Sequence, residues 1–149
     1  MGKLLDRWRV WRRRRAMAVW SARVERERTA IGRFSDSVQQ KLQAQVPQKA
    51  LHDILVALDE LLTNVVMHAE QAAGPIEVEL RYGVRAVEAT ISYIATEFDP
   101  TTWRAAPSGM TIAASRIGGL GIQLVRTLMD EFRYEYFDGR NVLKLVKYC

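Results

Sequence analysis

The sequence predicts an α/β (α+β) two-layer sandwich, with helices on one face of a mixed, largely antiparallel sheet. Two observations support this prediction. Along the chain the hydrophobic pattern changes in the order strand, helix, helix, strand, strand, long loop, helix, strand, strand. A length of 149 residues, with 48% hydrophobic and 26% charged side chains, suits one globular domain with a single core.

The first two predicted elements are a strand and a helix. Residues 18–25 alternate loosely between apolar and polar side chains, which predicts a strand. From Thr29 onward, apolar residues recur every three or four positions, which predicts an amphipathic helix. This helix should end before Val46-Pro47, because a residue that precedes proline disfavours the helical region.

The second predicted helix is long. It should start near Pro47, since proline suits the first helical turn, and run to about Ala69. Gly74-Pro75 is expected to stop it. The apolar stripe that it should bury consists of Leu51, Ile54, Leu55, Leu58, Leu61, Leu62, Val65 and Val66.

Two strands and a long loop follow. Residues 76–80 alternate cleanly, residues 82–84 suggest a turn, and residues 86–95 are predicted to be the return strand. Residues 101–117 have no periodicity and are rich in Thr, Ala, Ser, Pro and Gly. A structureless loop of this length in a compact domain is usually functional or mobile.

The last part of the chain predicts a helix and a closing hairpin. Gly118-Gly119-Leu120-Gly121 opens the helix. Residues 133–137 and 142–148 should pair around the turn Asp138-Gly139-Arg140-Asn141. The side chains that the helix should turn inward are Ile122, Val125, Leu128 and Met129.

The formal net charge of +5 is distributed unevenly. Residues 1–28 hold ten Lys and Arg against three acids, which is +7, and the rest of the chain holds twelve against fourteen, which is −2. We therefore expect a basic, Arg- and Trp-rich extension over residues 1–17 and a folded domain over residues 18–149. The acidic balance of this domain argues against direct nucleic-acid binding by it.

The basic extension has two interpretations. If residues 4–15 are helical, Leu4, Trp8 and Trp11 share a face opposite several arginines, which could lie on an anionic membrane surface or touch nucleic acid. The alternative is a disordered extension, or a segment upstream of a true start at Met17. The sequence shows neither a secretory signal nor a membrane span, and Cys149 is its one cysteine, so we expect a cytoplasmic protein.

Glu60 and Asn64 are the first candidates for chemistry. They lie four residues apart inside an apolar run, so both side chains should project from one face of the long helix. A carboxylate that acts as a base and an amide oxygen that ligates a hard cation would suit a metal-bound polyphosphate. The alternative is a polar helix edge that reaches solvent.

The glycine-rich helix start is the second candidate. Glycines let the backbone approach a phosphate, and the free N–H groups of a helix N-terminus favour an anion, although the same pattern also serves simply to close a loop. Residues 101–129 contain no acidic residue but contain Arg104, Arg116 and Arg126. A segment of this charge would tolerate a triphosphate; the alternative is that the pattern is due to chance. His52 and His68 lack the companions of a zinc site.

Taken in this order, these motifs resemble the GHKL (Bergerat) ATP-binding fold, and above all the small serine/threonine kinases that act as anti-sigma factors in bacteria. Residues 58–69 are similar to the N-box of that family. Phe98-Asp99-Pro100 is similar to the end of its first glycine box, and residues 116–126 are similar to its second. The resemblance covers roughly residues 19–147.

The resemblance implies roles for individual residues. Glu60 would be the general base, Asn64 would hold Mg²⁺ against the phosphates of ATP, and residues 101–117 would be a lid. It further implies phosphoryl transfer to a STAS-domain antagonist, regulation of a sigma factor, and often a homodimer. The implied nucleotide-binding residues are Asn64, His68, Phe98, Asp99, Gly118, Gly119, Leu120 and Gly121.

Two positions depart from the family pattern. Where the family has an aspartate that accepts the adenine amino group, and a glycine two residues later, this chain has Tyr93 and Ala95. Loss of a hydrogen bond to a buried group costs about 1–3 kcal/mol, and a phenol also fills space. Two hypotheses follow: an ATP- and Mg²⁺-dependent kinase, or a degenerate domain that binds a partner protein without nucleotide.

Overall fold

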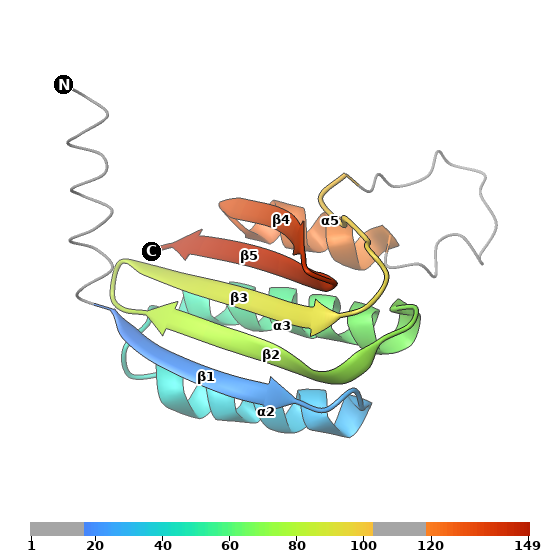
Figure 1. Cartoon of the computed structure of the whole chain (residues 1–149). Coiled ribbons are helices and arrows are strands. Elements are labelled where there is room, and N and C mark those ends of the chain that lie inside the picture. Colours follow the sequence, from blue (N-terminus) through green and yellow to red (C-terminus); the bar gives the residue numbers. More distant parts are fainter. Residues whose placement is uncertain (1–16, 103–118) are drawn as a thin grey trace.

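The computed structural model describes residues 17–102 and 119–149, which contain three helices and five strands (Figure 1). Their order confirms the predicted succession of strands and helices. The predictions for residues 1–16, for most of the long loop and for Gly118 lie outside the described residues. In chain order the elements are β1 (Ala18–Val24), α2 (Arg28–Leu42), α3 (Gln48–His68), β2 (Ala73–Tyr82), β3 (Ala86–Ile94), α5 (Gly119–Leu128), β4 (Glu131–Phe137) and β5 (Arg140–Tyr148).

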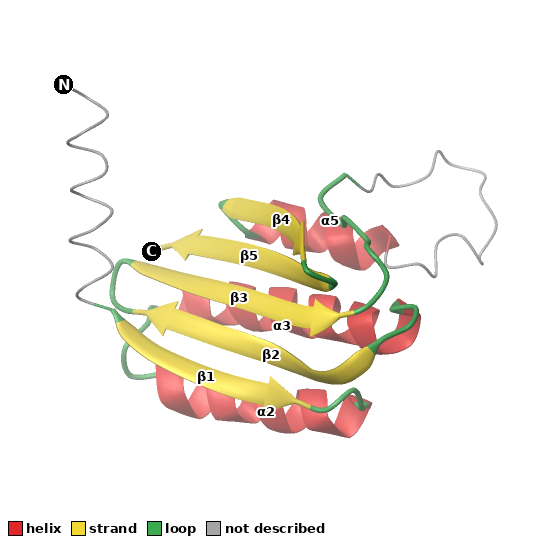
Figure 2. Cartoon of the chain, viewed as in Figure 1, coloured by secondary structure: helices red, strands yellow, loops and turns green. Residues whose placement is uncertain are grey.

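The five strands form one sheet in the order β1-β2-β3-β5-β4, and the helices lie on one face of it (Figure 2). This confirms the predicted two-layer sandwich. One correction applies: all four strand pairings in the described chain are antiparallel, so this sheet is not mixed. The helices α2 and α3 return the chain to the end of β1, where Ile76 of β2 pairs with Val24, so that even this long connection joins antiparallel strands.

The core lies between the sheet and the helices. Along β2 and β3 the side chains alternate, and those on the helix-facing side are buried, as expected for a sheet with one covered face. The predicted apolar stripe of α3 is confirmed, although Leu55 and Val66 are only partly buried at its margins. On the edge of the layer, Trp20 of β1 stacks on Phe34 of α2 with a centroid separation of 5.8 Å.

The end of α3 differs from the prediction. The helix ends at His68, close to the predicted Ala69, but Gly74-Pro75 does not stop it. Ala69 already has an extended backbone, and Gly74 and Pro75 lie inside β2. The register of β2 with β3 shifts there, between Ala73 and Glu77, and a proline without an N–H donor is tolerated at such an irregularity.

The hairpin between β4 and β5 is tighter than predicted. Asp138 and Gly139 alone form the turn, with φ angles of 51° and 76°. Positive φ at both central residues is typical of a type I′ turn, whose twist matches that of the strands. Arg140 and Asn141, which the sequence prediction placed in the turn, therefore belong to β5.

The uncovered face of the sheet carries a belt of polar side chains across four neighbouring strands. Glu77 of β2 lies 3.9 Å from Arg23 of β1 and 3.1 Å from Arg140 of β5, measured between side-chain N and O atoms. The Nε atom of Arg140 also donates to Ser92 Oγ of β3 at 2.9 Å. This face therefore carries a belt of charges next to exposed apolar side chains, among them Ile94 and Phe137, which pair with Arg140.

Within residues 17–102 and 119–149, no helix combines the length and apolar character that crossing a membrane requires. The longest described helix, α3, is continuous, but the polar residues Asp53, Glu60 and Asn64 interrupt its apolar sequence.

Candidate functional site

A cavity of about 220 Å³ opens beside the C-terminal end of α3. The backbone N–H of Thr96 donates to the carbonyl of Glu70 at 2.9 Å, which joins the segment after β3 to the segment after α3. The cavity wall mixes apolar and polar side chains, as binding pockets for small molecules do. The lining residues are Asn64, Val65, His68, Ala69, Glu70, Tyr93, Thr96, Glu97 and Phe98.

Asn64, one of the residues that line this cavity, carries a buried polar atom without a hydrogen-bond partner. Its Oδ1 atom is buried and accepts no hydrogen bond from any residue in the described part of the chain. A buried acceptor that stays unsatisfied costs about 1–3 kcal/mol, so an atom of this kind is usually satisfied by a water, an ion or a ligand. A neutral amide oxygen is among the hard ligands that Mg²⁺ accepts, and Asn64 therefore fits the cation that the resemblance implies.

Glu60 lies one helical turn before Asn64 on the same face of α3, and it meets the start of α5. A Cβ atom built on Gly121 would clash with Glu60 Oε2 and lie 3.2 Å from Glu60 Cδ. Only a glycine at position 121 leaves room for the Glu60 carboxylate at this place. The structure therefore brings the predicted base and the predicted glycine-rich helix start into contact.

Asn141 of β5 holds the segment after β3 in place. Its Oδ1 accepts hydrogen bonds from the backbone N–H of Phe98 at 3.0 Å and from the hydroxyl of Tyr134 at 2.6 Å. Its Nδ2 donates to the carbonyls of Ala95 at 3.3 Å and of Thr96 at 3.2 Å. The side chain is fully buried, and these four bonds use the whole capacity of its amide.

Tyr93, which occupies the position of the family's aspartate, is buried and lines the cavity without closing it. Burial, with a smaller contribution from Tyr134, raises the pKa of Tyr93 to about 12. The phenol therefore stays protonated near neutral pH and can donate a hydrogen bond as well as accept one, which a carboxylate cannot. Ala95 has no positive φ, so the backbone at this position does not require glycine.

Asp99 and Arg126 organise the chain at the entry to the long loop. Asp99 Oδ1 accepts hydrogen bonds from the backbone N–H of Thr101 at 2.9 Å and from its hydroxyl at 2.6 Å. Arg126 of α5 donates from Nη2 to the carbonyl of Pro100 at 3.1 Å and to that of Thr101. Both side chains thus stabilise the loop entry, and Arg126 is engaged by backbone carbonyls.

The structure gathers some predicted site residues at the cavity and leaves others apart from it. Asn64, His68 and Phe98 line the cavity, and Glu60 contacts Gly121 beside it. Leu120 is 77% exposed at the start of α5, immediately after Gly119. The cavity lining does not include Asp99. The ligand contacts expected of these residues remain predictions.

Sequence analysis missed the polar residues that support the site from β5. Asn141 lies two positions before Leu143, and Lys147 lies two positions after Leu145, so both fall in the inward series of a strand. A polar side chain in such a series signals a buried hydrogen-bonding role. Across residues 17–102 and 119–149, no group of three or more His, Cys, Asp or Glu side chains is placed to hold a metal ion.

The fold and the site together define an ATPase-type sandwich domain. Helices cover one face of an antiparallel sheet, and one of them carries a carboxylate and an unpartnered amide oxygen beside a glycine-rich helix start. Residues 20–147 match the model of the histidine kinase-like ATPase domain. The chain belongs to this family, which confirms the resemblance to the GHKL anti-sigma-factor kinases.

Two relatives and one solved structure illustrate the similarity. The chain is 34% identical over 106 residues to the serine-protein kinase RsbW of Listeria innocua, and the match covers 67% of each protein. It is 31% identical over 97 residues to the serine/threonine-protein kinase BtrW of Bordetella bronchiseptica, with 64% of this chain and 68% of that protein covered.

The solved structure contains the RsbU and RsbW domains of a Mycobacterium tuberculosis protein. It matches 87% of this chain with a TM-score of 0.59 at 16% identity, which supports the fold. The match spans only 32% of the length of that protein.

Proposed function

We propose that this chain is an ATP- and Mg²⁺-dependent serine/threonine protein kinase that regulates transcription as an anti-sigma factor. The observation that supports this most is the buried, unpartnered Oδ1 of Asn64, a residue that lies one turn from Glu60 and lines a cavity. A bound cation would satisfy this oxygen, whereas the binding of a partner protein does not require an amide at this place. The names of the two relatives, both protein kinases, point in the same direction.

The proposed roles follow from the donor and acceptor chemistry of each residue. Asn64 would ligate Mg²⁺ through its amide oxygen, and Glu60 would accept the proton of the attacking hydroxyl. Bound Mg·ATP would supply the phosphoryl group, so the chain itself would contribute positioning and proton removal. The other nucleotide-binding residues would be His68, Phe98, Asp99, Gly118, Gly119, Leu120 and Gly121, the glycines through backbone N–H groups.

The proposal includes the partners and the extent of the active unit. The acceptor would be a serine or threonine of a STAS-domain antagonist, and the regulated partner would be a sigma factor. Residues 18–149 would form the kinase domain, acting in the cytoplasm and pairing as a homodimer. Residues 1–17 would be a basic extension of that domain, with residues 4–15 available to an anionic membrane surface.

A second candidate function is a regulatory module that binds a partner protein without nucleotide. Tyr93 favours it, because a phenol replaces the carboxylate that would accept the adenine amino group. Asn141, its neighbour in the sheet register, offers no replacement, since all four hydrogen-bonding positions of its amide are taken. The two functions therefore make different demands on the part of the cavity beside Tyr93, where the adenine of ATP would bind.

A thermal-shift titration with Mg·ATP separates the two functions. For the kinase we expect a rise in Tm, which corresponds to about 2.7 kcal/mol when ATP reaches one hundred times its Kd. Asn64→Ala should remove most of the Mg²⁺-dependent part of the shift, whereas Gln123→Ala, at an exposed position of α5, should not.

The double variant Tyr93→Asp, Ala95→Gly tests whether the residues at the proposed adenine position weaken nucleotide binding. It should bind Mg·ATP more tightly than the wild-type chain, because it recovers the acceptor and the space of the family's pocket. If the Tm of the wild-type chain does not change at millimolar Mg·ATP, the kinase proposal is wrong. The second candidate, a regulatory module that binds a partner without nucleotide, is then favoured.

A further inference from the structure

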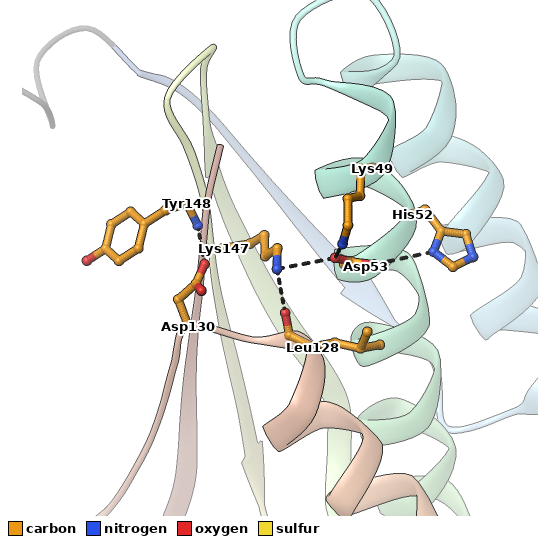
Figure 3. A network of polar contacts seen from close by, with 7 residues as sticks. All are labelled: Lys49, His52, Asp53, Leu128, Asp130, Lys147 and Tyr148. Atoms are coloured by element: carbon orange, nitrogen blue, oxygen red, sulfur yellow. Dashed lines mark hydrogen bonds and ion pairs between the residues drawn. The ribbon is translucent and has the colours of Figure 1, made fainter.

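A network of polar contacts around Asp53 lies toward the N-terminal end of α3 (Figure 3). The cavity lies beside the C-terminal end of the same helix. Asp53 is the centre of the network and is only 3% exposed. Its Oδ2 lies 2.8 Å from Lys49 Nζ and 3.2 Å from Lys147 Nζ, and its Oδ1 lies 3.4 Å from His52 Nδ1. Burial acts to raise the pKa of Asp53, but the hydrogen bonds from Lys49, Lys147 and His52 outweigh burial and hold the pKa below its ordinary value.

Lys147 joins three elements through this network. It lies in the inward series of β5, and its side chain is only 16% exposed. Its ammonium group pairs with Asp53 of α3 and donates a hydrogen bond to the backbone carbonyl of Leu128, the last residue of α5, at 2.9 Å. A cation at this place also suits the negative end of the helix dipole of α5.

The helices α3 and α5 are thus held together at two places. At one, Lys147 bridges Asp53 to Leu128, and at the other, Gly121 packs against Glu60. On each helix the two places are seven residues apart, which is about 10 Å along the axis. The helices run antiparallel between these places, and the bridge through Lys147 is the contact made by hydrogen-bonding groups.

We propose that Asp53 and Lys147 are positioning residues for the nucleotide site. The bridge from Asp53 through Lys147 to Leu128 sets the axial position of α5 on α3. It thereby places Gly121 beside Glu60, about two helical turns from the bridge itself. The effect on nucleotide binding rests on the proposed function, whereas the placement of the helix does not.

Hydrogen–deuterium exchange tests the placement without any ligand. Lys147→Met keeps the apolar stem of the side chain and removes its charge. We expect the amides of residues 123–125, toward the other end of α5, to exchange about tenfold faster, while those of β2 and β3 keep their wild-type rates. Lys144→Met is the matched control, because Lys144 lies on the same strand but is exposed. A change confined to residues 127 and 128 would overturn the proposal.

Calorimetric titration with Mg·ATP, at a temperature where every variant is folded, tests the consequence for the site. We expect Lys147→Met to raise the Kd about tenfold and Lys144→Met to leave it unchanged. Lys147→Arg should recover most of the affinity, because it keeps the charge and the donors. A purely structural role would lower the Tm of Lys147→Met and leave its Kd equal to that of the wild-type chain, which would contradict the proposal.

A second variant covers the case in which Lys147→Met does not fold. Asp53→Leu combined with Lys147→Met leaves no unpaired ion in the core and should show the same faster exchange in α5. Unchanged exchange in this variant would overturn the proposal. If the wild-type chain itself fails to bind Mg·ATP, the proposed function is wrong, and the exchange data still decide whether the bridge positions α5.

Discussion

Gly32 and Gly121 both lie in helices, but their surroundings are opposite. A Cβ at Gly32 of α2 would meet nothing within 4 Å, whereas one at Gly121 would meet the carboxylate of Glu60. The atom met at Gly121 is the end of a flexible side chain, so the clash is relieved by moving Glu60 rather than by separating the helices. Glycine at position 121 therefore determines where the Glu60 carboxylate can lie, and it matters less for the stability of the fold.

We predict that alanine at these two positions has different effects. Gly32→Ala should raise the free energy of unfolding by about 0.5–1 kcal/mol, because glycine in a helix carries that entropic cost. Gly121→Ala should lower the rate of phosphoryl transfer about tenfold or more through displacement of Glu60, with little loss of stability. Urea denaturation and a kinase assay measure the two effects. Wild-type activity in Gly121→Ala would show that the transfer does not depend on where this carboxylate lies.

At the scale of the elements, the charges around Asp53 connect α3, α5 and β5, and this connection predicts a pH dependence. Because the folded state lowers the pKa of Asp53, the resulting stabilisation is present above the ordinary carboxyl pKa of about 3.9 and is lost as the pH falls through the lower, folded-state value. Asp53→Asn should therefore be less stable than the wild-type chain by about 2 kcal/mol at pH 7. That difference should shrink progressively below about pH 4.

Unfolding curves recorded from pH 7 down to pH 3 measure this difference. Asp59→Asn is the matched control on the same helix, because the side chain of Asp59 is exposed, and it should show a small difference at every pH. A constant gap between the wild-type chain and Asp53→Asn over the whole range would contradict the assigned role of the ionised carboxylate.

Local patterns predicted the elements because each pattern reports which face of a helix or strand is buried. The same patterns failed where the outcome depends on distant parts of the chain. Gly74-Pro75 is accommodated by an irregularity in the pairing of β2 with β3. The contacts of Asn141 and Lys147 are made with residues of distant segments that pack against β5, such as Ala95 and Asp53. The sequence predicted that Glu60 and Asn64 share a helix, which α3 confirms.

The substitution of tyrosine at position 93 shows the limit of prediction at the site. From the sequence, a buried phenol could close the adenine pocket or leave it open, because either outcome depends on the path of the chain after β3. The bonds from Asn141 to Ala95, Thr96 and Phe98 fix that path, and a cavity remains beside Tyr93. No local pattern contains this information.

At the scale of the whole molecule, the buried hydrophobic side chains of the described chain run from Val24 to Leu145, within the proposed kinase domain. Because we expect residues 1–16 to be an extension of this domain, their removal should change the free energy of unfolding by less than about 0.5 kcal/mol. It removes seven bases and one acid, which takes the formal net charge from +5 to −1. Urea denaturation and retention on a cation exchanger measure the two effects, and a large loss of stability would show that the domain extends further toward the N-terminus.

The polar belt from Arg23 through Glu77 to Arg140 has a consequence for the uncovered face of the sheet. Exposed ion pairs contribute at most about 1 kcal/mol each, so the belt adds little to the stability of the fold. Its charges are well hydrated, and a second sheet could stack on this face only by stripping that water away. The part of the open face that carries the belt thus stays hydrated, and there it opposes the face-to-face stacking that a bare apolar sheet would invite.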